Sequence, residues 1–264
     1  VPGTDIAGTV ESVGSAVQDW KPGDEVFGNC TGAFAEYAVA SASELVAKPT
    51  GLDFEGTSAL GVSAQTALQA IRDHLGVEPG QRVLVTGASG GVGSFAVQVA
   101  KALGAEVTAV CSARNAELVE SIGADHVIDY TSQDFTAGSE RYDRILDNVA
   151  AHSMSDTRGV LTPDGLLLSN GAPVSGWFGG LGNVFRSMLW SMVSKQQARP
   201  FVSTYSQADG QALKELVEEG KVTPVIDRVF PLDDGPAALA HVAGRHAQGK
   251  TIITMGQPAE QPAD

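Results

Sequence analysis

The fold of this chain is decided at residues 82–93, which read RVLVTGASGGVG. The run RVLVT is short, mostly apolar and rich in β-branched side chains, so it predicts a buried strand over residues 82–86. The glycines that follow lead into residues 91–103, where we expect a helix that ends at Gly104. A strand, a tight loop and a helix therefore follow one another without a linker.

The alternation of strand and helix continues beyond this segment. Further strands are predicted at 106–111, 126–129, 144–148, 166–169 and 201–205, with helices at 115–122 and 153–161. Short apolar strands that alternate with helices form parallel sheets that are buried on both faces. We therefore assign the chain to the α/β class, with a Rossmann-type, doubly wound parallel sheet in a domain over residues 53–206.

The two ends of the chain have a different pattern. Residues 1–52 contain short strand-forming runs separated by glycines and turns, as in part of a small β-barrel. Residues 207–264 carry predicted helices at 211–219 and 235–244 and predicted strands at 225–230 and 251–255. Both end segments are therefore expected to lie outside the Rossmann sheet.

Composition narrows the range of functions. The 264 residues are 43% apolar and 18% charged, and the formal net charge is −14 at pH 7. So acidic a chain repels phosphate backbones, which excludes nucleic acid as a partner. Cys30 and Cys111 form no CxxC motif, which favours a reducing, cytoplasmic location over a disulfide framework. The longest apolar region, 181–193, is too short and too interrupted to be a transmembrane segment.

The glycine loop fits the dinucleotide-binding fingerprint, with Ala88 in the place of its first glycine, followed by Gly90 and Gly93. Gly90 would let the backbone approach a pyrophosphate, and Gly93 would let the helix pack close to the strand. The free N–H groups and the positive end of the helix dipole would then face the phosphates. The loop therefore predicts a dinucleotide cofactor.

A second interpretation of the same loop stays open. Residues 87–91, GASGG, also fit the G-x-S-x-G nucleophile elbow of α/β-hydrolases, with Ser89 as the nucleophile. Asp209 or Asp227 followed by His241 would complete the catalytic order. No HGGG-type oxyanion segment precedes the loop, so the sequence favours the dinucleotide interpretation.

The end of the second strand indicates which dinucleotide is bound. NAD-specific sites carry an acid there for the ribose 2′-hydroxyl, but this chain has no acid between Cys111 and Glu117. Ser112 and Arg114 are hydrogen-bond donors suited to a 2′-phosphate. The sequence therefore predicts NADPH as the cofactor.

Several motifs together carry a resemblance to a known family. They are Gly80-Gln81, Ala88-Ser89-Gly90-Gly91, Gln98 and Lys101 around the loop, and PGTDIAG at 2–8, GAFAEY at 32–37, GAD at 123–125 and GK at 249–250 elsewhere. In these motifs the chain resembles the zeta-crystallin-type quinone oxidoreductases, which are zinc-independent medium-chain dehydrogenases/reductases. The resemblance implies a GroES-like catalytic domain formed by 1–52 and 207–264, and a homodimer joined through the last Rossmann strand.

The resemblance also implies a set of cofactor-binding residues. The glycine loop would hold the pyrophosphate, the segment after the second strand the 2′-phosphate, and further positions the adenosine phosphate, the ribose and the nicotinamide. In this numbering they are Thr66, Ser89, Gly90, Gly91, Val92, Gly93, Ser112, Arg114, Tyr130, Asn148 and Gly171.

The reaction that the resemblance implies needs no metal. Zinc-dependent relatives carry His-Glu and Cys where this chain has Thr4-Asp5 and Val62, so we predict no metal site. Without a Lewis acid the site suits reduction of an activated acceptor, a quinone or an α,β-unsaturated carbonyl, better than oxidation of an alcohol. We therefore predict NADPH-dependent hydride transfer to a small hydrophobic electron acceptor.

Two points stay open at this stage. Family members begin with a longer segment that lines the cleft, so no proton donor is named and an NADPH-binding structural or regulatory protein remains an alternative. The apolar stripe at 181–193 has helical spacing, which fits either ordinary packing or the wall of a pocket for a bulky acceptor.

Overall fold

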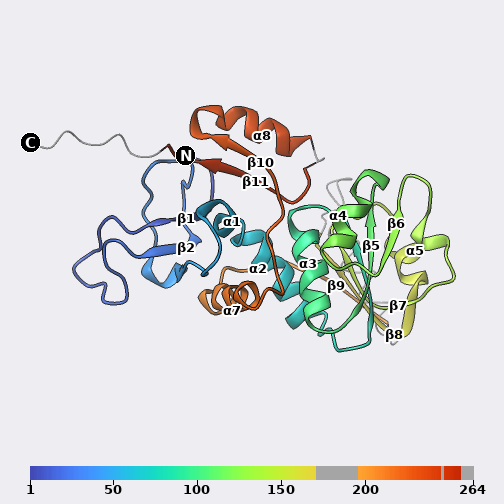
Figure 1. Ribbon diagram of the computed structural model, residues 1–264. Coiled ribbons are helices and arrows are strands. Elements are labelled where there is room, and N and C mark those ends of the chain that lie inside the picture. Colours follow the sequence, from blue (N-terminus) through green and yellow to red (C-terminus); the bar gives the residue numbers. More distant parts are fainter. Residues whose placement is uncertain (171–195, 245–246, 257–264) are drawn as a thin grey trace, which may run out of the picture. The chain divides into compact units, whose positions relative to one another are not determined.

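The computed structural model describes residues 1–170, 196–244 and 247–256. Contacts divide the chain into two compact units, Val1–Gln65 with Thr204–Asp264 and Thr66–Ser203. We call them the terminal unit and the central unit (Figure 1). We keep as a proposal the predicted domain boundaries, with the GroES-like domain at 1–52 and 207–264 and the Rossmann domain at 53–206. Gly171 and the apolar stripe at 181–193 lie outside the described residues.

The central unit contains a six-stranded sheet with the order β6-β5-β4-β7-β8-β9, and every described pair in it is parallel. The strands are β4 (Arg82–Thr86), β5 (Glu106–Cys111), β6 (His126–Asp129), β7 (Tyr142–Asp147), β8 (Leu161–Ser169) and β9 (Gln197–Pro200). Chain order runs outward from β4 in one direction and then from β7 in the other. This reversal makes the sheet doubly wound, as predicted, and places a topological switch point between β4 and β7.

Short helices connect the strands of this sheet. They are the π-helix η2 (Gln69–His74), α3 (Gly91–Ala102), η3 (Ala113–Asn115), α4 (Ala116–Ser121), η4 (Phe135–Ala137) and α5 (Met154–Gly159). Helix α3 packs against β4 and β5. Its Phe95 and the strand residues Leu84 and Ile145 are fully buried. The apolar runs of the sequence therefore form the core that holds the glycine loop in place.

One predicted strand is wrong. Residues 201–205 form no regular element, and the last strand of the sheet is β9, Gln197–Pro200. Strand β9 is an edge strand with no buried residue, so its sequence QARP lacks the apolar signal on which the prediction relied. Phe201 is buried and Val202 is 85% exposed. The apolar residues that suggested a strand therefore belong to the connection after it.

The terminal unit is built from both ends of the chain. An antiparallel sheet joins β1 (Asp5–Thr9), β2 (Glu25–Asn29) and β3 (Leu45–Ala47), and a parallel pair joins β10 (Ile226–Pro231) and β11 (Lys250–Thr254). The helices are η1 (Ala42–Glu44), α1 (Phe54–Ser58), the start of α2 (Val62–Leu68), α7 (Gln207–Glu218), η5 (Leu232–Asp234) and α8 (Gly235–Ala243).

Hydrogen bonds join the segment that follows the central unit to the first part of the terminal unit. The Tyr205 hydroxyl donates to the Glu44 carbonyl at 2.7 Å, and the Ser206 N–H donates to Gln65 Oε1 at 2.9 Å. Burial raises the pKa of Tyr205 to about 12, so this phenol keeps its proton at neutral pH. The two end segments therefore form one folded unit.

Candidate functional site

The glycine loop follows β4 and leads directly into α3. Gly87 has φ +61°, a left-handed conformation that glycine adopts without strain. The Gly90 N–H donates to the Gly87 carbonyl at 3.0 Å, and the Ala88 N–H donates to the Val110 carbonyl at 3.1 Å. Gly90 caps α3 without a side-chain hydrogen bond. The first N–H groups of the helix are therefore left for a ligand.

Gly93 is where the helix and the strand come closest. An added Cβ there would stand 2.1 Å from the Gly87 oxygen and 2.7 Å from the Ala88 Cα, so no other residue fits without moving the backbone. At Gly90 the same test gives 3.3 Å to the Gly87 oxygen, a tight contact. The loop therefore has the compact backbone that a pyrophosphate needs at a helix N-terminus, and a dinucleotide fits it.

The switch point lies beside this loop. The Thr86 hydroxyl, at the end of β4, donates to Asp147 Oδ1 at the end of β7, at 2.7 Å. The Asn148 side chain donates to the Thr86 carbonyl at 2.9 Å and accepts from Asn170 Nδ2 at 3.0 Å. These bonds hold Asn148, a predicted site residue, at the carboxyl end of the sheet, where ligands bind in open α/β folds.

The loop after β5 contacts the glycine loop directly. Asn115 is buried, and its Nδ2 donates to Ser89 Oγ at 2.7 Å. Ser112 caps η3, and Arg114, two residues on, is exposed. Burial raises the pKa of Cys111 to about 11, so this thiol is neutral at pH 7. The predicted pyrophosphate and 2′-phosphate segments are thus neighbours, joined by a contact that the sequence did not indicate.

The structure also adds an acid that the sequence analysis missed. The Asp129 carboxylate, at the end of β6, accepts from the Ala113 N–H at 3.1 Å and from the Thr131 hydroxyl at 2.8 Å. Hydrogen bonds from Thr131, and further ones from Ser132 and Ala113, lower its pKa. Asp129 therefore ties the β5 and β6 loops together. Tyr130, the next residue, is 59% exposed, and its N–H donates to the Cys111 carbonyl.

Two further site predictions lie elsewhere. Thr66 is buried, and its hydroxyl shares a hydrogen bond of 2.7 Å with the Ser203 hydroxyl. Gly171 lies outside the described residues. The part of the predicted site that the structure brings together is thus the glycine loop, the loops after β5 and β6, and Asn148.

Two of the residues named in the hydrolase interpretation form a pair. His241 Nε2 lies 2.5 Å from Asp227 Oδ2, so two of the candidate residues do meet. Both belong to the terminal unit, whereas Ser89 belongs to the central unit and receives its hydrogen bond from Asn115. Within the described part of the central unit, the group beside the Ser89 hydroxyl is therefore the Asn115 amide.

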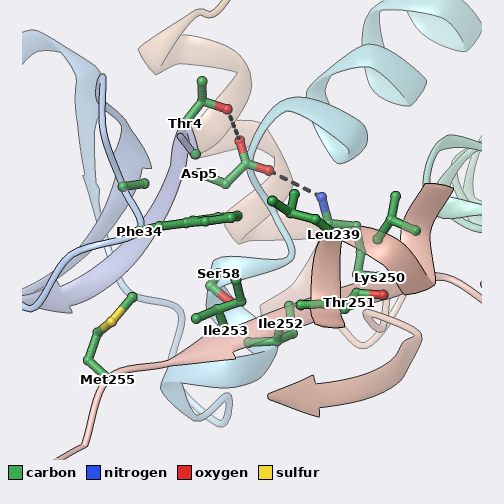
Figure 2. Close-up of a pocket in the computed structure, with 14 residues that line it drawn as sticks. Thr4, Asp5, Phe34, Ser58, Leu239, Lys250, Thr251, Ile252, Ile253 and Met255 are labelled. Carbon is green, nitrogen blue, oxygen red and sulfur yellow. Dashed lines mark hydrogen bonds and ion pairs between the residues drawn. The ribbon is translucent and has the colours of Figure 1, made fainter. Parts of the chain in front are cut away.

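Asp5, one of the residues compared above with the zinc-dependent relatives, forms an ion pair with Lys250. Asp5 Oδ2 lies 3.2 Å from Lys250 Nζ, and Asp5 Oδ1 accepts from the Val62 N–H at 3.0 Å. Among the described residues, no cluster of three or more His, Cys, Asp or Glu side chains could hold a metal ion. This pair borders a cleft of about 240 Å³ in the terminal unit (Figure 2).

Sequence profiles of two families match the chain. The zinc-binding dehydrogenase profile covers residues 122–253, and that of the alcohol dehydrogenase GroES-like domain covers residues 1–50. Among known proteins, the mitochondrial NAD(P)H oxidoreductase RTN4IP1 of Bos taurus is 37% identical over 96% of this chain and 70% of its own length. The chain belongs to the medium-chain dehydrogenase/reductase family.

Other members of this family extend the comparison. The trans-enoyl reductase pgmF of Aspergillus terreus is 34% identical over 98% of this chain and 78% of its own length. The solved structure of the quinone oxidoreductase from Coxiella burnetii superposes with a TM-score of 0.84 at 28% identity, covering 95% of this chain and 78% of that one. The resemblance to quinone oxidoreductases drawn from the motifs is confirmed.

Two properties of this medium-chain dehydrogenase/reductase follow from its family. It is an oxidoreductase that uses a nicotinamide cofactor, and its substrate is a small molecule. Among the residues that the structure describes, no helix combines the length and the apolarity that crossing a membrane requires.

Proposed function

We propose that the protein is an NADPH-dependent, zinc-independent oxidoreductase that passes a hydride to a quinone or an α,β-unsaturated carbonyl. The observation that supports NADPH most directly is the loop after β5. This loop lies against the glycine loop through the bond between Asn115 and Ser89, and it presents Ser112 and Arg114 where NAD-specific relatives carry an acid.

Each part of the cofactor has residues suited to it. The N–H groups at Gly91, Val92 and Gly93 would hold the pyrophosphate, because a helix N-terminus favours anions, and Gly90 would let the phosphates come close to the backbone. The Arg114 guanidinium and the Ser112 hydroxyl would hold the 2′-phosphate, to which arginine can donate two parallel hydrogen bonds. Ser89, Tyr130, Asn148, Thr66 and Gly171 complete the proposed site.

Asp129 has a positioning role in this proposal. Its carboxylate is turned toward the Ala113 N–H and the Thr131 hydroxyl. These bonds shape the loop that carries Ser112 and Arg114. The acid therefore supports a phosphate-binding loop through the backbone.

The bound dinucleotide would supply a hydride at its nicotinamide ring. An electron-poor acceptor such as a quinone or an enone needs chiefly to be positioned and to have its developing oxyanion stabilised. An alcohol substrate would need a metal or a base to lower the pKa of its hydroxyl, and Thr4 and Val62 are not metal ligands. The names of the relatives, a quinone oxidoreductase and a trans-enoyl reductase, agree with this choice of acceptor.

The cofactor assignment is tested by removing one guanidinium. Arg114→Ala should weaken NADPH binding by about 1.5 to 3 kcal/mol, the range for hydrogen bonds to charged groups, and leave NADH binding nearly unchanged. Isothermal titration with both cofactors measures this. The matched control is Arg141→Ala, an exposed arginine of the same unit whose guanidinium donates to the carbonyls of residues 138–140. Equal losses for NADPH and NADH would refute the assignment.

The reaction is tested by following NADPH oxidation optically with a panel of 1,4-quinones and enones. Turnover that Arg114→Ala slows, and that higher NADPH restores, is the expected result. Tight NADPH binding without turnover of any acceptor would instead support the structural or regulatory alternative. Ester hydrolysis abolished by Ser89→Ala would support the hydrolase.

Assembly and location remain proposals of their own. We propose a cytoplasmic homodimer, because relatives of the quinone oxidoreductase type are expected to pair through the last strand of the Rossmann sheet. Sedimentation equilibrium at micromolar concentration gives the mass of the species in solution. A monomer at every concentration would contradict the dimer and leave the proposed reaction untouched.

A further inference from the structure

The cleft of the terminal unit has apolar walls and a small polar corner. Its volume is about 240 Å³. Phe34, Leu239, Val242, Ile253 and Met255 supply much of the apolar lining, and Leu239 and Val242 of α8 are 49% and 51% exposed. An apolar cavity with a few polar groups at one place is the usual form of a small-molecule site, because the walls supply burial and the polar groups supply orientation.

Lys250, the first residue of β11, provides the charge in this corner. Its Nζ lies 3.2 Å from Asp5 Oδ2 and 3.2 Å from Ser63 Oγ, and its side chain is only 18% exposed. An ammonium has three N–H donors. Among the described residues, Asp5 and Ser63 accept hydrogen bonds from two of these N–H groups. The third N–H group can therefore donate to a ligand.

Asp5 is held in place from several sides. Its Oδ1 accepts from the Val62 N–H at 3.0 Å and from the Thr4 hydroxyl at 3.3 Å. Gly61 packs so closely that an added Cβ would stand 2.2 Å from the Asp5 carboxyl carbon. Figure 2 shows the carboxylate and the ammonium facing each other at the cleft. The ammonium is therefore positioned before any ligand arrives, which lowers the entropy lost on binding.

We propose that the cleft binds the quinone or enone acceptor itself, with the carbonyl oxygen accepting a hydrogen bond from the Lys250 ammonium. The rings or chain of the acceptor lie against Phe34, Leu239 and Ile253. The acceptor class rests on the proposed function, whereas the recognition of a carbonyl by Lys250 is a binding property that needs no cofactor. Lys250 is thus a specificity-determining residue.

The test compares two flat molecules that differ in their oxygens. The probe is 2,3-dimethyl-1,4-naphthoquinone, whose substituted ring carbons cannot add a lysine or cysteine, and the reference is 2,3-dimethylnaphthalene. Equilibrium dialysis of the full chain without cofactor gives both dissociation constants. The wild type should bind the quinone more tightly. Lys250→Met, which keeps an unbranched apolar side chain, should weaken quinone binding about tenfold and leave the hydrocarbon unchanged.

Matched variants separate recognition from structural support. Asp5→Asn breaks the ion pair but keeps the ammonium, so its preference for the quinone should persist even where its melting temperature falls. Lys250→Arg should restore most of the preference. Lys250→Gln removes the charge but keeps a shorter, polar side chain and should also weaken quinone binding, which keeps the test usable if Lys250→Met fails to fold.

Two outcomes would overturn the proposal. One is an unchanged quinone preference in folded Lys250→Met or Lys250→Gln. The other is a loss of NADPH affinity in Lys250→Met with quinone binding intact, which would make Lys250 a cofactor residue. A quinone preference that depends on Lys250 in a protein that never oxidises NADPH would refute only the proposed function. Turnover with no such preference would refute only this inference.

Discussion

The central and terminal units bury their strands in different ways. In β4 and β5, inside the parallel sheet, every residue after the first is buried. In the terminal unit β2 has three buried residues, β3 has two and β11 has one, and β1 and β10 have none. A parallel sheet covered on both faces excludes water from whole strands, and the strands of the terminal unit are only partly covered. The central unit is thus held by packing, and the terminal unit depends more on particular bonds such as the pair between Asp5 and Lys250.

The largest expected effect is a cavity in the central unit. Leu84 of β4 is 0% exposed, so Leu84→Ala should lower the free energy of unfolding by about 2 to 5 kcal/mol. Val229 of β10 is 41% exposed, and Val229→Ala should change it by no more than about 0.5 kcal/mol. Urea unfolding, followed by circular dichroism, measures both. Similar losses of unfolding free energy in the two variants would contradict the difference in burial between the two units.

The next effect comes from overpacking at the glycine loop. Gly93→Ala places a Cβ against the Gly87 oxygen, so it should destabilise the protein by about 1 to 3 kcal/mol and abolish NADPH binding. Gly159, at the end of α5, has nothing within 4 Å of its would-be Cβ, and Gly159→Ala should be neutral or stabilising. Thermal unfolding with and without NADPH separates the two. A Gly93→Ala protein that binds NADPH normally would contradict the close approach of helix and strand.

The smallest effect is a dependence on pH that both units share. Hydrogen bonds lower the pKa of Asp129 in the central unit and of Glu218 in the terminal unit, the latter from the Thr50 N–H and hydroxyl. A carboxyl group with a lowered pKa stabilises the folded state fully above its ordinary pKa, and the stabilisation is lost as the pH falls through the lowered value.

Asp129→Asn and Glu218→Gln should therefore each make the acid-side loss of melting temperature shallower than in the wild type. Thermal scans between pH 7 and pH 3 measure this. Because neither group is buried, we expect shifts of similar, small size. A steeper acid-side loss in either variant would show that the sign is wrong.

The sequence predicted the interior of the central unit well. Strands β4, β5 and β6 begin and end at the predicted residues, and β4 and β5 are buried over nearly their whole length. Strand β9 was missed because it lies at the edge of the sheet, where an exposed QARP segment pairs through its backbone alone. The opposite edge strand, β6, has no buried residue either, but its neighbouring Val127 and Ile128 mark it as a strand, and QARP contains no such β-branched pair.

The candidate site likewise has a part that the sequence predicted and a part that it did not. The fingerprint predicted the glycine loop, because Gly93 has no substitute where helix and strand meet. It did not predict the bond between Asn115 and Ser89, or the contact between Asp129 and the Ala113 N–H. These partners are 26 and 16 positions apart in the chain, and no local spacing rule relates them.

By itself the sequence determined the α/β class, the order of the central strands along the chain and the loop that suits a dinucleotide. Each of these follows from local chemistry. β-branched runs mark the strands, glycines mark the helix ends, and the lack of a Cβ allows the tight loop. Only the tertiary structure decided which polar groups meet. Asp129 ties two loops together, and Lys250 faces Asp5 across 245 positions of sequence at the edge of an apolar cleft. A hydrogen bond acts over about 3 Å in space, and only the packing of the whole core brings such groups within that distance.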